Sequence, residues 1–180
     1  MVKTLGLCLF VGLLSLGAVP LHAQQHDGVH DFDWDFGTWQ THQRRLLHPL
    51  TGSTTWVEYR GTDVVNRIYD GANSGVIEAD GAAGHLEIYT LRMYDADAHQ
   101  WNIYFGHGPG AALTQPVIGE FKSDHAEFYD QEQYKGKTIL VRFAISSITK
   151  TTCHFEQAFS ADGGKAWETN FIVDETLTKS

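Results

Sequence analysis

The sequence contains little of what disulfide bridges or nucleic-acid binding require. Of its two cysteines, Cys8 lies in an N-terminal apolar stretch and Cys153 is the only one beyond it. A disulfide within the remainder of the chain is therefore impossible, and stability must come from the core. Basic residues are also scarce, at 13 Lys and Arg against 22 Asp and Glu, and no basic stripe occurs. Nucleic acid and anionic membrane surfaces are thus not expected partners.

Signatures of common catalytic and metal sites are absent as well. No Gly-x-Ser-x-Gly, His-Glu-x-x-His, phosphate-binding loop or Cys-x-x-Cys occurs. The many histidines do not share ligand spacing within one strand; His26 and His30 lie four residues apart, but in a polar tail. His107 lies in a glycine-rich loop that could gate a cavity. We therefore expect no metal and no cofactor, and the sequence identifies no catalytic residue.

A long apolar run occurs only at the N-terminus. Lys3 precedes the apolar stretch from Leu5 to Val19, which is shorter than the roughly 20 residues that a membrane-spanning helix needs. A cleavage site that ends in the small residue Ala23 follows. The processed chain would then begin at Gln24 and not at a cysteine. Residues 1–23 are therefore predicted to be a signal peptide, and the mature protein to be periplasmic or secreted without a membrane span.

The rest of the chain is rich in aromatics and in short strand signals. It holds nearly all of the 10 Phe, 7 Tyr and 5 Trp, which favours a β-rich fold with an apolar interior. Strand signals alternate with Gly-, Asn- and Asp-containing turns, and no helical period is sustained. We predict strands at 38–47, 54–65, 76–78, 86–94, 100–106, 117–122, 126–134, 138–147, 152–160 and 167–175. The fold class is therefore predicted as all-β, a single antiparallel up-and-down barrel of about ten strands.

The first strand opens with Gly37-Thr38-Trp39, a Gly-x-Trp that resembles the opening signature of lipocalin-type barrels. Just before it, residues 31–36 alternate acids with aromatics. In similar barrels such a segment closes the base, so residues 24–36 are expected to do so and residues 37–180 to form the barrel. Trp39 is expected to pack at this closed end. The barrel is accordingly expected to be lipocalin- or fatty-acid-binding-protein-like.

A second local motif, Ser160–Trp167, resembles the Asp-box of sialidases and other propellers. In that motif an Asp carboxylate accepts turn N–H groups while glycines adopt positive φ. A propeller carries one copy in each blade, and this chain has one copy. The motif therefore predicts a β-hairpin and implies nothing about sugar cleavage.

Alternation along the last three predicted strands assigns their faces. Apolar burial places one set inside, with Gln157 and Thr169 as its polar members. Arg142 and Glu156 then form an outer cross-strand pair; with the faces reversed, they would be a buried pair at a candidate site. The predicted inner set is Val141, Phe143, Ile145, Phe155, Gln157, Phe159, Trp167, Thr169, Phe171 and Val173, and the outer set is Arg142, His154, Glu156, Glu168, Asn170 and Asp174.

The earlier strands leave more than one face assignment open. An inward Arg45 or Arg92 would need Glu58 or a ligand carboxylate as its partner, which would suit a fatty or aromatic acid. Either Arg could instead lie near the rim with its head group in water. The candidate lumen residues are Trp39, Gln43, Arg45, Trp56, Glu58, Arg92, Trp101, Phe105, Phe143, Phe155, Gln157 and Phe171.

Several stretches together resemble a family of bacterial secreted proteins of unassigned function. They are residues 36–39, 91–95 with Gln100-Trp101, 117–121, 155–160 and 167–170. Members of that family are regarded as lipocalin-like or fatty-acid-binding-protein-like barrels, so the resemblance implies the same fold here. It supplies no catalytic residue.

Three functions are compatible with these observations. The first is a barrel that binds a small apolar or amphipathic molecule in its lumen. The second is an isomerase, cyclase or hydrolase acting on a lipid-like substrate in that cavity, with Glu58 as acid or base and Arg45 or Arg92 holding an anion; two titratable lumen groups with shifted pKa values would favour it. The third is an interaction barrel whose interior is filled.

Overall fold

The computed structural model describes residues 27–108, 110 and 112–180. The predicted signal peptide and Cys8 lie outside the described residues. The chain forms ten strands: β1 (Gly37–Leu46), β2 (Trp56–Tyr69), β3 (Ala72–Gly81), β4 (Gly84–Asp95), β5 (Gln100–His107), β6 (Val117–Lys122), β7 (His125–Tyr134), β8 (Lys137–Ser146), β9 (Thr152–Ser160) and β10 (Glu168–Lys179).

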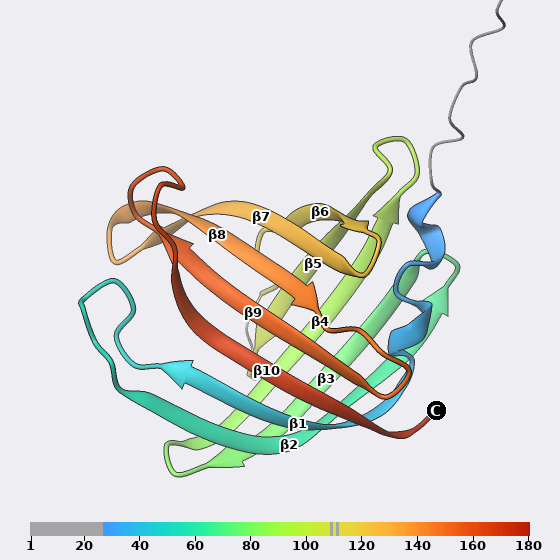
Figure 1. The fold of residues 1–180 in the computed structure, drawn as a ribbon, viewed down its shortest axis with the longest axis horizontal. Helices are drawn as coiled ribbons and strands as arrows, with labels where there is room; N and C mark the ends of the chain where they lie inside the picture. The colour runs from blue at the N-terminus through green and yellow to red at the C-terminus, as the bar shows by residue number, and fades with distance from the viewer. Residues whose placement is uncertain (1–26, 109, 111) are drawn as a thin grey trace, which may run out of the picture.

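The strands close into one antiparallel up-and-down barrel (Figure 1). Each strand pairs with its neighbours in sequence, and β1 pairs with β10 from Thr38–Lys179 to Arg45–Phe171. Closure gives every described strand a partner on both sides, although β5 and β6 pair only from Trp101–Gly119 to Ile103–Val117. The predicted all-β, ten-stranded architecture is confirmed.

Two short 3-10 turns, η1 (Gly28–His30) and η2 (Asp33–Asp35), precede the barrel. They lie at the end opposite the β1–β2 loop (Figure 1). The Phe32 ring, 1% exposed, stands edge-on to the Trp101 and Phe121 rings, with centroids 4.9 Å away in both cases. The apolar core of this end, which we call the base, therefore includes residues from before β1.

Backbone carbonyls of the same segment receive the indole N–H groups of the base. Trp39 Nε1 donates to Asp35 O at 2.8 Å, and Trp101 Nε1 donates to Gly28 O at 2.9 Å. Both tryptophans are fully buried. Trp39 thus packs at this end of the barrel, as expected from its place in the Gly-x-Trp motif.

The prediction of a short third strand at 76–78 was wrong, because β3 runs from Ala72 to Gly81. Residues 73–75 resemble a turn in sequence, yet they pair with both β2 and β4. Gly75 fits there because a Cβ would lie 2.7 Å from Thr90 Oγ1 and 3.1 Å from Asp63 Oδ1. A glycine that looked like a turn signal instead makes room for two inward polar groups.

The face assignment of the last strands is correct on β8 and β9 and fails at the start of β10. A register irregularity between Thr169 and Phe171 interrupts the alternation. Asn170 is consequently buried, whereas Thr169 Oγ1 donates to the outward Glu156 carboxylate at 2.8 Å. Trp167 also lies outside, where its ring contacts Tyr129 and the Arg142 guanidinium.

Two smaller predictions are confirmed. Asp162 Oδ1 accepts the backbone N–H groups of Lys165 and Ala166, each at 3.0 Å, which is the hairpin role predicted for Ser160–Trp167. Arg142 and Glu156 form the outer cross-strand pair, with 3.9 Å between Nη2 and Oε1. In the part of the chain that the structure describes, no helix is long and apolar enough to cross a membrane.

If residues 27–36 are part of the cooperative fold, truncating Phe32 will destabilise the whole barrel. We expect Phe32→Ala to lower the free energy of unfolding by about 3–5 kcal/mol, the usual cost of removing a buried Phe ring. Ile68→Ala, at a position 50% exposed, should change it by about 0.5 kcal/mol or less. Urea titration followed by tryptophan fluorescence measures both, and equal stabilities of Phe32→Ala and the wild type would contradict the prediction.

Candidate functional site

The barrel encloses a cavity of about 740 Å³ between the base and the opposite end, which we call the mouth. Its walls are mainly aromatic and aliphatic, with Phe105, Phe143 and Phe171 only half-buried. Aromatic surface that faces the interior and stays uncovered by other side chains is available to a ligand. This volume is typical of pockets for small organic molecules, so the interior is not filled.

Seven of the twelve candidate lumen residues line this cavity. They are Arg45, Arg92, Phe105, Phe143, Phe155, Gln157 and Phe171. Gln157 is held by a 2.8 Å hydrogen bond from its Nε2 to Asn170 Oδ1, so the β10 irregularity supplies a polar partner that the sequence pattern did not predict. Gln43 points inward but is fully buried, and its Nε2 donates to Thr41 Oγ1 at 2.6 Å.

The prediction that Trp56 and Glu58 face the lumen was wrong. Trp56 is 38% exposed, and Glu58 bonds His42 on the outer surface, with 3.0 Å between Oε2 and Nε2. The buried residues of β2 are Tyr59, Asp63 and Val65. Apolar and polar residues occur on both faces at the start of β2, so alternation alone could not choose between the two assignments.

Arg92 lies at the cavity floor, on the side of the base. Its Nη1 donates to the Asp35 carboxylate and, at 3.3 Å, to Asn73 Oδ1, while its guanidinium lies 4.7 Å from the centre of the Phe32 ring. Arg92 is 4% exposed and Asp35 is fully buried. The partner of Arg92 is therefore Asp35, from the segment before β1. Glu58 is not its partner, and Arg92 is not left unpaired for a ligand carboxylate.

Two further carboxyl groups, Asp63 and Glu175, are buried close to this pair. Burial raises the pKa of Asp63 to about 7, against the opposing charge of Arg92. Burial, together with the carboxyl groups of Asp63 and Asp35, raises the pKa of Glu175 well above its usual value. Three carboxyl groups surround one cation, so they cannot all be ionised at neutral pH without uncompensated charge.

Burial also raises the pKa of Asp35, although the charge and hydrogen bond of Arg92 act against this. Burial disfavours the cationic form of Arg92, yet the Asp35 and Asp63 charges raise its pKa above the ordinary value. Arg92 is therefore a permanent cation. Asp63 is the group that lines the cavity and titrates near neutrality.

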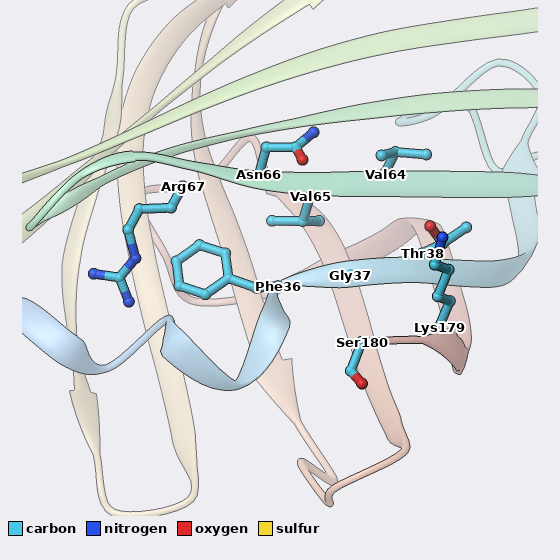
Figure 2. A pocket seen from close by; sticks show the side chains of 9 residues that line it. All are labelled: Phe36, Gly37, Thr38, Val64, Val65, Asn66, Arg67, Lys179 and Ser180. Atoms are coloured by element: carbon cyan, nitrogen blue, oxygen red, sulfur yellow. The ribbon is translucent and has the colours of Figure 1, made fainter.

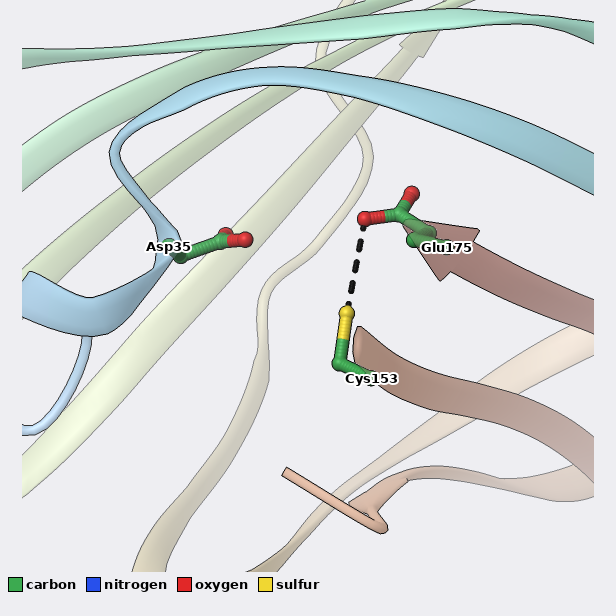
Figure 3. Close-up of side chains that lie close together, drawn as sticks. All are labelled: Asp35, Cys153 and Glu175. Carbon is green, nitrogen blue, oxygen red and sulfur yellow. Dashed lines mark hydrogen bonds between the residues drawn. The ribbon is translucent and has the colours of Figure 1, made fainter. Parts of the chain in front are cut away.

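Asp35, Cys153 and Glu175 place their ligand-type atoms within 4.8 Å of one another (Figure 3). Cys153 Sγ lies 3.5 Å from Glu175 Oε2, and burial, followed by the Glu175 charge, raises the pKa of the thiol. Metal binding needs free carboxylates, whereas here Asp35 is already bonded to Arg92. These residues therefore fit a neutralised acidic cluster better than a metal site.

The mouth carries exposed charges of both signs. Arg45, His107 and Lys135 are exposed there, and the carboxylate of Glu132 lies among them. Partial burial, followed by the Arg45 charge, lowers the pKa of His107, the last residue of β5, so this histidine is neutral at physiological pH. Exposed charges at the rim are well screened by water and salt.

A second hollow of about 460 Å³ lies outside the barrel, where β1 begins and β10 ends (Figure 2). Its Arg67 guanidinium lies over the Phe36 ring at 4.7 Å and is paired with Asp33 and Asp70. The Arg67 guanidinium of this hollow is therefore already occupied by two carboxylates. The lumen is therefore the better candidate site.

Sequence reasoning missed the acidic part of the floor. Asp35, Asp63 and Glu175 come from η2, β2 and β10, which are distant in sequence, and no short motif joins them. One signal was present: an Asp at position 63 among apolar residues of a predicted strand is costly to bury without a partner. That signal could have pointed to Asp63, but not to its neighbours.

No protein-family model and no curated protein matches the chain. Among solved structures, the S-type phycobiliprotein lyase CPES from Guillardia theta is similar, with 11% identity, a TM-score of 0.56, and coverage of 87% of this chain and 95% of that one. EF1p2_mFAP2b bound to DFHBI has 10% identity, a TM-score of 0.46 and coverage of 84% and 99%. A de novo designed fluorescence-activating β-barrel has 10% identity, a TM-score of 0.45 and coverage of 85% and 99%.

At such low identity the likeness to the lyase shows the fold alone, which is a closed antiparallel β-barrel. The bacterial family that the sequence resembles is not shown by any match. The function must therefore be argued from the lumen itself.

The raised pKa of Asp63 predicts that the folded protein loses stability as the pH rises from about 4 to about 7, because the folded state then holds a proton that the unfolded state has released. Asp63→Asn should remove this contribution. Its free energy of unfolding should therefore exceed that of the wild type by on the order of 3 kcal/mol at about pH 8. Glu175 acts in the same direction, so part of the slope will remain.

Urea titrations of both proteins at acidic and mildly alkaline pH measure the effect. Asp80→Asn, on the outer face of β3 and paired only with exposed His85, is the matched control. The prediction fails if the stability difference between Asp63→Asn and the wild type is the same at both pH values.

Proposed function

We propose that the barrel binds a small, largely apolar molecule in its lumen. The supporting observation is the cavity of about 740 Å³, which has aromatic walls at its middle and a polar floor at one end. An interior of this size would normally be filled by side chains, because an apolar void lowers the stability of a protein. A cavity retained at this cost is what a binding function requires.

An enzyme acting on an apolar substrate is the second candidate, and it is supported by a different residue from the one first expected. Glu58 lies outside the barrel and cannot serve it. Asp63 lines the lumen with a pKa of about 7, which suits a group that gives and takes protons at neutral pH.

We also propose that residues 1–23 are removed on export and that the barrel functions in the periplasm or outside the cell. The apolar stretch, the basic Lys3 and the small residues that end at Ala23 support this. N-terminal sequencing of the protein from the medium or periplasm of an expressing bacterium should begin at Gln24. Retention of residues 1–23 in a cell-associated protein would overturn the proposal.

Filling the lumen should abolish ligand binding. Ile77 is buried on β3 and lines the cavity, whereas its neighbour Val76 is 41% exposed on the outer face. We expect Ile77→Trp to bind Nile red, a neutral apolar dye, about tenfold or more weakly than the wild type does, because the indole occupies the space of the dye. Val76→Trp is the matched control and should bind as the wild type does.

Native mass spectrometry of the protein as purified gives a second readout. A co-purifying organic molecule that is present on the wild type and Val76→Trp, and absent from Ile77→Trp, would support lumen binding. Recovery of that molecule with a changed mass after incubation would favour the enzyme. Equal binding of dye by all three proteins would place the bound dye outside the lumen and contradict the proposal.

A further inference from the structure

The interior of the barrel holds buried side-chain oxygens without a hydrogen-bond partner, and one of them belongs to a residue that lines the lumen. Among the described residues, buried side-chain oxygens without a hydrogen-bond partner in the protein include Asp35 Oδ1, Gln43 Oε1 and Asp63 Oδ1. The unpartnered nitrogens belong to Trp34 and Arg44, and neither residue lines the cavity. Buried acceptors normally have a partner, so this floor is suited to a group that brings donors.

Of the three residues that carry these acceptors, Asp63 is the one that lines the cavity. The residue is 2% exposed and lines the lumen from β2. Gly75 of β3 lies against its carboxyl group and has no side chain to cover it. The Thr90 hydroxyl, beside the same glycine, accepts the Gly75 N–H at 3.0 Å and also lines the cavity. Asp63 Oδ1 is therefore buried and unpartnered, in a side chain that lines the lumen.

The charge around Asp63 disfavours an anionic ligand at the floor. Arg92 is the cation of this cluster, and its Nη1 already bonds Asp35 and Asn73. The same guanidinium also interacts electrostatically with the carboxyl groups of Asp63 and Glu175. A carboxylate ligand would add a fourth acidic group to one cation in a site of low dielectric, which costs far more than in water.

We propose that Asp63 is a binding residue for a basic nitrogen, and that the lumen takes a hydrophobic amine in preference to a fatty or aromatic acid. The ammonium group donates to Asp63 Oδ1 and supplies the second positive charge that the cluster lacks. The aromatic walls at Phe105, Phe143 and Phe171 cover its apolar body. This inference rests on the proposed lumen-binding function and reverses the ligand charge expected from Arg92 in the sequence.

Three compounds with the same apolar frame test the inference, namely phenylbutylamine, phenylbutyrate and butylbenzene. Each is titrated against the Nile red complex at about pH 8, where an alkylamine is cationic and a carboxylic acid is anionic. For the wild type we expect the amine to bind about tenfold or more tightly than the acid, as a charge-assisted hydrogen bond would give. This comparison needs no variant.

Asp63→Asn should lower the affinity for the amine by about tenfold. Its affinity for butylbenzene should stay unchanged, because the apolar walls are intact. Unchanged butylbenzene binding also shows that the variant is folded. Asp80→Asn, on the outer face, should match the wild type with all three compounds.

The outcomes separate the two proposals. Suppose that butylbenzene binds and that Ile77→Trp prevents this binding. If the amine then binds no better than the acid, or binds Asp63→Asn as tightly as the wild type, the lumen function stands and the role of Asp63 is overturned. If Nile red binds the wild type no better than it binds Ile77→Trp, the proposed function itself fails.

Discussion

The interior is organised around one cation, Arg92, buried among three carboxyl groups. Because a buried charge is tolerable only with partners, Arg92 on β4 requires Asp35 from the segment before β1 and the amide of Asn73 on β3. The pair lies where the aromatic base ends and the open lumen begins. It thereby joins the chain before the barrel to the barrel wall, and it divides the interior into a packed half and an accessible half.

Stability alone does not explain this cluster. Replacing a buried ion pair by well-packed apolar residues often leaves stability unchanged or increases it, and the base shows that this chain can pack aromatics closely. Asp63 and Glu175 make the arrangement more costly still, since burial raises the pKa of both. Costly acidic groups beside a cavity are more readily understood as parts of a site.

The fold was accessible from the sequence because its signals are local. Turn residues bound most strands, the Gly-x-Trp lies where β1 begins, and alternation assigns β8 and β9 correctly. The site was accessible only in part. Gln157 was identified by period, and Arg92 was named as a candidate although the face of its strand was left open. The irregularity that turns Asn170 inward and the outward face of Glu58 depend on closure of the barrel. The three acids meet only in three dimensions, so the sequence pattern could not reveal that the floor around Arg92 is acidic.

The position of each charged group determines how strongly it can select a ligand. Arg45, Lys135 and Glu132 lie at the mouth, where water and salt screen their charges and a long side chain can turn away. At the floor, Asp63 is fixed between β3 and β4 neighbours and shielded from solvent, so an interaction with it is strong and directional. The mouth can therefore affect how fast ligands enter, while the floor decides which polar group is accepted. A rim of mixed charge above an acidic floor would admit many apolar molecules but retain those with a donor at the buried end.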